Sequence, residues 1–401
     1  MGFSSGLPLL LVGATLSWRL ATVGVDKTTI GLFTLVGLPY ALKFIWAPLF
    51  DAVGLTQRVS RLGYRRVSML IVQAALALAL VLLGSVDVVR DPYLFAMFAL
   101  LVAFLSSCQD IVVDAYRIEI LSLEEQALGS SATQLGYRMG LLASGAGALF
   151  LSETMTWQGV YSVMAACILV GMVAALLAPR PDNSPPATRG GLATLRAPFR
   201  AFFSKPLWGW LLVFIVLYKL TDSVAGVMAN PFYYAIGFQA SQVAVVSKLY
   251  GLLATLSGIA LGGLLCVRWG LYRGLMVCGI LQMLSNLFFA WQAVVGADIT
   301  WLYVTITAEN LSGGMGSAAF VAFLSALCHR TWAATHFALL TSFMAFGRTV
   351  LASSSGWFAD NMTWVAFFIM SSAVAVPSLV MLYLLRGVFA TWLNDTTPKK
   401  T

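Results

Sequence analysis

The sequence contains little charge. Only 10% of its 401 residues are Asp, Glu, Lys or Arg, and 60% are hydrophobic, whereas about 25% charged residues are usual in soluble proteins. The mean hydropathy is +0.87. Because a soluble core cannot absorb this much apolar surface, the composition predicts a polytopic membrane protein. The net charge of +8 rests on few, scattered cations, which argues against nucleic-acid binding and favours basic cytoplasmic loops.

Residues that commonly bind metals or perform catalysis are also few. The chain has two histidines and five cysteines, and each cysteine lies in or beside an apolar run, as small buried side chains do. There is no metal-ligand cluster and no phosphate-binding loop, so we expect no metal and no cofactor. Gly2–Gly6 fits a hydrolase GxSxG elbow and Gly314–Ala319 a dinucleotide fingerprint, but neither has the strand context that its motif requires. We therefore expect no enzyme.

Long apolar runs fill most of the chain. A helix needs about 20 apolar residues to cross a bilayer, and barrel strands would be shorter and alternating. No basic segment precedes the first run, so no signal peptide is predicted. The predicted helical spans are 3–19, 29–50, 67–86, 93–116, 127–150, 157–178, 206–234, 242–265, 273–295, 300–327, 336–357 and 363–385. Glycine pairs within them, Gly136/Gly140 and Gly258/Gly262, suggest that helices approach closely there.

The longest polar interruption, residues 179–205, is rich in Pro, Gly and Arg and divides the spans into six plus six. It predicts an N-terminal six-helix bundle over residues 1–178, a cytoplasmic linker, and a C-terminal six-helix bundle with a short tail over residues 206–401. Lys and Arg gather in alternate loops, in the linker and in the tail. The positive-inside rule therefore places both termini and the linker in the cytoplasm.

The two halves repeat weakly. GYRMGLLASGAG in the fifth span resembles FGRTVLASSSG in the eleventh, which puts Arg138 and Arg348 at equivalent positions. Two six-span halves joined by a basic linker are typical of the major facilitator superfamily, in which substrates bind near the middle of the membrane. The predicted fold is an all-α membrane protein with twelve transmembrane helices, the major facilitator fold.

The loop after the second span supports this prediction. Asp51, followed by Gly63-Tyr64-Arg65-Arg66, looks like a stretched form of the superfamily's loop motif, an Asp followed by Gly-Arg-Lys/Arg. In the second half, Gly262, Gly263, Arg268 and Gly270 resemble the same motif without the Asp. We predict a gate formed by Asp51, Arg65, Arg66 and Arg117. As an alternative to any transport role, Asp51, Asp114 and Arg117 would form a structural ion-pair cluster that holds the inward gate shut.

Carboxylates inside the spans are candidates for carrying a proton. A charge at the bilayer centre costs about 2.5–3.5 kcal/mol on insertion scales, so such residues usually face a polar interior. Asp110 and Asp114 share one face of the fourth span, Asp222 lies in the seventh and Glu309 in the tenth. In this fold the first, fourth, seventh and tenth helices line the cavity, which favours Asp110 or Glu309 as the proton site.

Several segments are more specific than the superfamily. GFSSGLPLLL, GLPYALKFIWAPLFD, CQDIVVDAY, LGYRMGLLASG, VLYKLTDS and ENLSGGMGSAAFVAFLSALC resemble the AmpG-type muropeptide permeases nearly end to end. The acetyl-CoA transporters are more distant relatives. One departure is that family members usually have a further stretch before the GFxSGLP-like segment, whereas this sequence begins inside its first span.

The resemblance implies a proton-driven transporter of the bacterial inner membrane. It would carry N-acetylglucosaminyl-1,6-anhydro-N-acetylmuramyl peptides from the periplasm to the cytoplasm, as a monomer in the lipid bilayer, for cell-wall recycling and β-lactamase induction. The alternative keeps the fold and changes the cargo to another anionic solute, such as an acyl-CoA, a peptide or a drug. An intramembrane enzyme is a further alternative, without a supporting nucleophile–base pair.

A muropeptide carries carboxylates and sugar rings. Arginine binds carboxylates bidentately, and flat aromatic faces suit sugars. The alternatives are structural pairing of the cations, as Lys219 and Asp222 are three residues apart, and packing of the aromatic residues. The predicted substrate-binding residues are Arg138, Arg348, Lys219, Lys248, Gln109, Asn310, Tyr137 and Tyr218.

Overall fold

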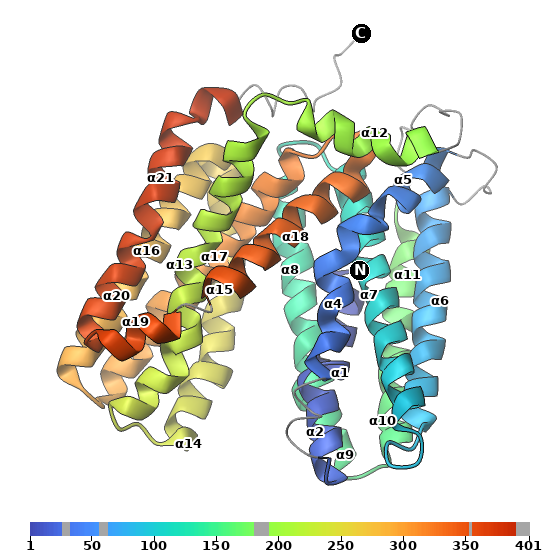
Figure 1. The fold of residues 1–401 in the computed structure, drawn as a ribbon, viewed down its shortest axis with the longest axis horizontal. Helices are drawn as coiled ribbons and strands as arrows, with labels where there is room; N and C mark the ends of the chain where they lie inside the picture. Colours follow the sequence, from blue (N-terminus) through green and yellow to red (C-terminus); the bar gives the residue numbers. More distant parts are fainter. Residues whose placement is uncertain (26–32, 56–62, 180–191, 353–354, 390–401) are drawn as a thin grey trace. The chain divides into compact units, whose positions relative to one another are not determined.

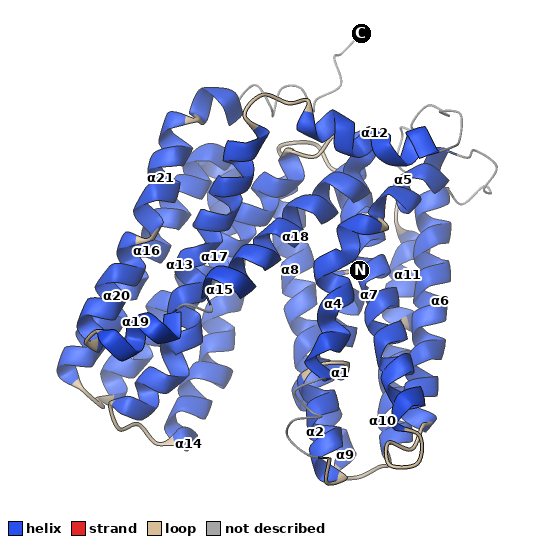
Figure 2. Cartoon of the chain, viewed as in Figure 1, coloured by secondary structure: helices blue, strands red, loops and turns tan. Residues whose placement is uncertain are grey.

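The computed structural model describes residues 1–25, 33–55, 63–179, 192–352 and 355–389. Within these ranges every regular element is a helix (Figure 2). Seven helices are long and apolar enough to cross a membrane, and they agree with predicted spans to within a few residues. They span Tyr64–Ser85 (α6), Pro92–Ile120 (α7), Trp157–Leu177 (α10 and α11), Trp208–Ala235 (α13), Val245–Trp269 (η4 and α15), Leu271–Val295 (α16) and Trp364–Leu384 (α20 and α21).

An eighth candidate is a bent pair. Helix α17 (Ile299–Ala326) and the helical segment Arg330–Ala345 meet at 105°. That segment contains η5 (Arg330–Trp332) and the start of α18 (Ala333–Ala352). The prediction had assigned these two helices to separate spans, the tenth and the eleventh.

The remaining predicted spans are interrupted helices, which is consistent with the twelve-span prediction. Pro8 lies inside the helix of the first span, and the π-helix η3 contains two glycines that weaken a regular helix. The pieces are α1 (Gly2–Leu11) with α2 (Ala14–Thr22); η1 (Phe33–Gly37), α4 (Leu38–Leu42), η2 (Lys43–Ile45) and α5 (Ala47–Leu55); α8 (Gln126–Leu142), η3 (Ala143–Gly147) and α9 (Ala148–Ser152); and α18 with α19 (Ser355–Asn361).

The chain forms two compact units. The first contains residues 1–121, 132–201 and 328–342, and the second contains residues 122–131, 202–327 and 343–401. The start of α8 thus belongs to the second unit, although α8 was predicted in the N-terminal half. The start of α18 belongs to the first unit, although α18 was predicted in the C-terminal half. The predicted linker contains a helix, α12 (Leu192–Phe203). In the first unit, His336 Nε2 lies 3.0 Å from the Pro198 carbonyl oxygen and connects α18 to this helix.

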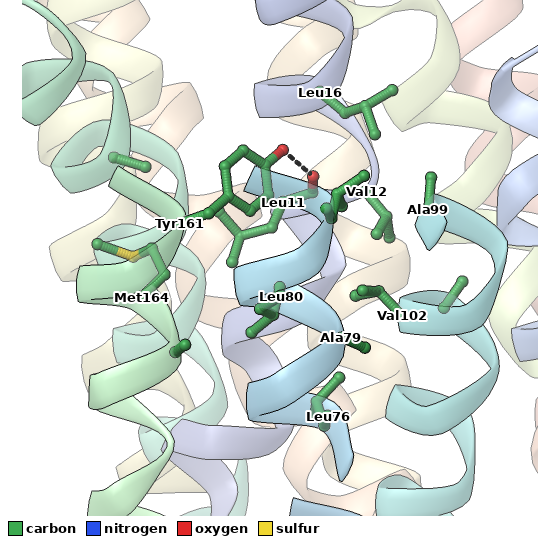
Figure 3. Close-up of a cluster of buried hydrophobic side chains, with 14 of the residues drawn as sticks. Leu11, Val12, Leu16, Leu76, Ala79, Leu80, Ala99, Val102, Tyr161 and Met164 are labelled. Atoms are coloured by element: carbon green, nitrogen blue, oxygen red, sulfur yellow. Dashed lines mark hydrogen bonds between the residues drawn. The ribbon is translucent and has the colours of Figure 1, made fainter. Parts of the chain in front are cut away.

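An apolar core fills the first unit between α1, α2, α6, α7 and α10. Figure 3 shows Leu76, Ala79 and Leu80 of α6 between Met164 of α10 and Val102 of α7 in this core. Helix α1 ends at Leu11, and in its last turn the Pro8 and Leu10 carbonyls accept from the backbone N–H groups of Val12 and Gly13. The Tyr161 hydroxyl donates a 2.8 Å hydrogen bond to the Leu11 carbonyl (Figure 3). The core therefore also stabilises the break in the first span.

Glycines allow the closest helix contacts in both units, as predicted. A Cβ atom on Gly140 of α8 would lie 2.2 Å from the Phe3 carbonyl oxygen of α1. In the second unit, a Cβ on Gly258 of α15 would lie 2.2 Å from the Leu311 carbonyl oxygen of α17. Any larger side chain would push these helices apart.

Candidate functional site

An ionic cluster of Asp51, Arg65 and Glu119 lies where α5, α6 and α7 meet. Gly63 begins α6 with φ 84°, a left-handed conformation that glycine adopts without strain. Arg65 Nη2 lies 3.0 Å from Asp51 Oδ1, and Arg65 Nε donates to Glu119 Oε1 at 3.0 Å. The Tyr64 hydroxyl also donates to Glu119. The Arg65 side chain is 1% exposed, so the two carboxylates neutralise a fully buried guanidinium.

Asp51 also binds the start of α18. Its Oδ2 accepts hydrogen bonds from the Thr335 backbone N–H at 2.9 Å and the Thr335 hydroxyl at 2.7 Å, and its Oδ1 accepts from the Ala334 N–H at 3.2 Å. Free N–H groups and the positive end of the helix dipole favour a carboxylate there. This contact joins residues 284 apart in sequence, the end of the second predicted span and the start of the eleventh.

Arg117 is separate from this cluster. Its Nη2 lies 3.2 Å from Asp114 Oδ1, and its guanidinium carbon lies 5.3 Å from the ring centre of Phe337 in α18. The proposed grouping of Asp51, Asp114 and Arg117 in one cluster is therefore wrong, because Asp51 pairs with Arg65. Arg66 is half-buried, and its Nε has no hydrogen-bond partner among the described residues.

Glu119 was missed by the sequence analysis. The fourth span was predicted to end at 116, which left this residue in the loop, whereas α7 continues to Ile120. Its position two residues after Arg117, at the same end as the loop motif, is the signal that could have identified it. Outside the spans, the turn after α7 has a further carboxylate: a hydrogen bond from the Ser122 backbone N–H lowers the pKa of Glu125.

A polar layer crosses the interior of the first unit. It consists of Ser4 and Ser5 of α1, Gln73 of α6, and Ser106 and Gln109 of α7, all at most 5% exposed. Both amide atoms of Gln73 and of Gln109 have no hydrogen-bond partner in the described chain. Gln109 was predicted to bind substrate, but its complete burial argues against direct contact.

Asp110 lies beside this layer. Its Oδ1 is buried without a hydrogen-bond partner in the described chain. Lys43 of η2, Asp114 and the Ser5 hydroxyl are within its electrostatic range, and Tyr40 of α4 faces both Asp110 and Ser106. Lys43 is itself buried. Neither Lys43 nor Tyr40 was among the predicted site residues, although both lie in a predicted span.

The polar layer would lower the stability of the fold if protein atoms were its only hydrogen-bond partners. A buried donor or acceptor without a partner costs about 1–3 kcal/mol, so several together would consume much of a typical stability of about 5–15 kcal/mol. Such groups are therefore expected to have partners other than protein atoms.

The second unit pairs its half-buried charged side chains. Lys219 Nζ lies 2.8 Å from Asp222 Oδ2 in α13, as the spacing predicted. In α17, Asn310 Nδ2 donates to Glu309 Oε2 at 2.7 Å, and Asn310 Oδ1 accepts from the Thr255 hydroxyl of α15 at 2.8 Å. Glu309 is thus held by a side chain of its own helix.

Comparison with known proteins identifies the family. The profile of the Major Facilitator Superfamily matches residues 1–227. The anhydromuropeptide permease of Escherichia coli K12 is 38% identical over 404 residues, covering 100% of this chain and 82% of the relative. The chain belongs to the AmpG-type permeases of the major facilitator superfamily. The putative transporter AmpG 4 of Rickettsia conorii is 32% identical, covering 96% and 94% of the two chains.

Solved structures show the same fold. A bacterial fucose:proton symporter aligns with TM-score 0.68 and 12% identity over 96% of each chain. The proton:xylose symporter bound to 6-bromo-6-deoxy-D-glucose aligns with TM-score 0.66 and 13% identity, covering 98% of this chain and 96% of that one. These likenesses establish the major facilitator fold.

The other predicted substrate residues of this AmpG-type chain differ in their surroundings. Arg138 of α8 is exposed, and Tyr137 is half-buried near Tyr40. Tyr218 is buried, its hydroxyl donates to the Leu275 carbonyl at 3.0 Å, and its ring stacks on Phe320, so packing explains it better than sugar binding. The side chains of Arg348, in α18, and Lys248, in the π-helix η4, lie outside the described residues.

Proposed function

We propose that this chain imports anhydro-muropeptides across the bacterial inner membrane. The observation that carries the proposal is the 38% identity to an anhydromuropeptide permease along the whole chain. The exposed Arg138 and the Lys219–Asp222 pair add charged groups inside predicted spans, where lipid would penalise them. Arg138 would bind a carboxylate of the peptide, and Arg348 would serve as its counterpart in the second half.

Import is driven by protons and uses alternating access. Asp110 is the carboxylate most suited to carry the proton, because one of its oxygens has no protein partner in the described chain, whereas Glu309 accepts a hydrogen bond from Asn310. Asp222, paired with Lys219, and Asp114, paired with Arg117, are less available.

The ionic cluster acts as the cytoplasmic gate. Asp51 holds the start of α18, Arg65 pairs with Asp51, and Glu119 pairs in turn with Arg65. Opening towards the cytoplasm would require Asp51 to leave the α18 N–H groups. The gate is cytoplasmic because the positive-inside rule places the loop after the second span, the linker and both termini on that side.

Reconstituted liposomes test the function. Purified protein should take up radiolabelled anhydro-muropeptide, and an inward proton gradient should accelerate uptake. A protonophore should abolish the acceleration. Uptake that the protonophore does not change would contradict the proposed proton coupling. Uptake of an acyl-CoA or an unrelated peptide, with no uptake of anhydro-muropeptide, would overturn the assigned cargo.

A further inference from the structure

The polar layer of the first unit has a defined place between two apolar clusters. Helices α6 and α7 lie side by side (Figure 1). Met69 packs with Val113 in one cluster, and Leu76 packs with Val102 in the other. Gln73 lies between the two α6 positions and Gln109 between the two α7 positions. Two fully buried amides are therefore brought to the same level of the helix pair.

Helix α11 leaves room for this layer by means of a glycine. A Cβ atom on Gly171 would lie 2.2 Å from Ser4 Oγ and 2.8 Å from Gln73 Nε2. The hydroxyl and the amide therefore meet over a backbone that has no side chain. The two apolar clusters lie on either side of the layer along the helices. Polar partners for the Gln73 and Gln109 amides must therefore lie within the layer itself.

We propose that the polar layer binds internal water, and that this water connects Gln73 and Gln109 to the Asp110 carboxylate. A buried water needs two to four polar partners. Here the layer offers the amide donors and acceptors of Gln73 and Gln109, whose hydrogen-bonding capacity the described protein atoms leave unused. Water suits this mixture because it both donates and accepts.

The water gives the proposed proton site a solvated partner. This role rests on proton carriage by Asp110. The groups that face the carboxylate are Lys43, Asp114, Ser5 and Tyr40, and bound water adds a partner that can accept or donate a proton. Gln73 and Gln109 do not exchange protons with the substrate. They are positioning residues, which hold the water.

The second half offers a matched control. Gln282 of α16 is also buried, at 3% exposure, and its Nε2 has no hydrogen-bond partner in the described chain. A Cβ on Gly316 of α17 would lie 2.7 Å from its Oε1, so this amide, like Gln73, packs on a glycine of a neighbouring helix. Loss of Gln282 should not affect proton coupling.

Transport by three variants tests the proposal. Gln73→Leu should lower proton-driven uptake in liposomes about tenfold, the change that corresponds to the loss of one hydrogen bond. Exchange of labelled for unlabelled muropeptide without a gradient should persist, because it moves no net proton. Gln73→Ser, which keeps a hydroxyl and leaves space for water, should retain most of the uptake, and Gln282→Leu should resemble the unmodified protein.

Water is detected independently by X-ray hydroxyl-radical footprinting in ¹⁸O-water, which labels side chains next to bound water. Cys108 and Met69, both buried beside the layer, should be labelled in the unmodified protein and protected in Gln73→Leu. Protection in the unmodified protein would overturn the proposal, as would full proton-driven uptake by Gln73→Leu. Failure of the unmodified protein to transport muropeptide would instead refute the proposed function, while footprinting would still decide whether the layer holds water.

Discussion

The helix pairs α6–α7 and α16–α17 are built alike but carry different chemistry. Each first helix follows a glycine with φ 84°, Gly63 or Gly270, and each buries a glutamine, Gln73 or Gln282. In the first pair a second buried amide, Gln109, directly precedes Asp110 in α7, and an ionic cluster forms at the end. In the second pair the amide packs on Gly316. The backbone pattern is repeated, whereas the ionic cluster of Asp51, Arg65 and Glu119 is described for the first pair.

This difference separates scaffold from function. Features present in both halves, such as close glycine contacts and hydroxyl-to-carbonyl hydrogen bonds, should affect stability equally in either half. Features of the first half alone, the ionic cluster and the polar layer, should affect gating and proton coupling. Paired substitutions test this division.

The largest expected effect on stability comes from Arg65→Ala. It leaves the buried carboxylates of Asp51 and Glu119 without their cation, and removing one partner of a buried ion pair costs about 3–5 kcal/mol. The measurement is the free energy of unfolding in detergent. Arg273→Ala, at the start of α16, removes an exposed arginine and should cost about 0.5 kcal/mol or less. Similar losses in the two variants would contradict the asymmetry.

A smaller and symmetric effect is expected at the glycine contacts. Gly140→Val and Gly258→Val each place side-chain atoms against a carbonyl oxygen of the neighbouring helix, and overpacking costs about 1–3 kcal/mol. Thermal unfolding should show comparable destabilisation in both. Gly209→Ala, where a Cβ meets no atom within 4 Å, is the control. Loss in only one half would show that the repeat does not extend to helix packing.

The smallest expected effect is at two tyrosine hydroxyls. Tyr161→Phe and Tyr218→Phe each remove one hydrogen bond to a backbone carbonyl, to Leu11 and to Leu275, and each should cost about 1 kcal/mol. Tyr218→Phe should leave the concentration dependence of muropeptide uptake unchanged. A weakened apparent affinity would restore Tyr218 to the substrate site.

The sequence predicts those features that depend on local pattern. Apolar length predicts α6, α7 and α16 because lipid requires it. A spacing of three predicts the Lys219–Asp222 pair, since such residues are neighbours on a helix. Glycine pairs predict the close contacts of α8 and α15.

Features that depend on distant partners could not be predicted in the same way. Asp51 binds Thr335 across 284 positions, and nothing local to either residue indicates the other. Gln109 and Tyr218 were chosen for their chemistry, and the sequence did not indicate that both are buried. Gln73 was not predicted as a site residue, because a single amide in an apolar run indicates nothing about function until its neighbours in space are known.

The most direct test of the account compares the two candidate proton carriers. Proton-driven muropeptide uptake and gradient-free exchange are measured in liposomes for Asp110→Asn and Glu309→Gln. Asp110→Asn should lose stimulation by the proton gradient and keep exchange, whereas Glu309→Gln should keep stimulation. Full stimulation in Asp110→Asn, with its loss in Glu309→Gln, would contradict the assignment of proton coupling to the first half.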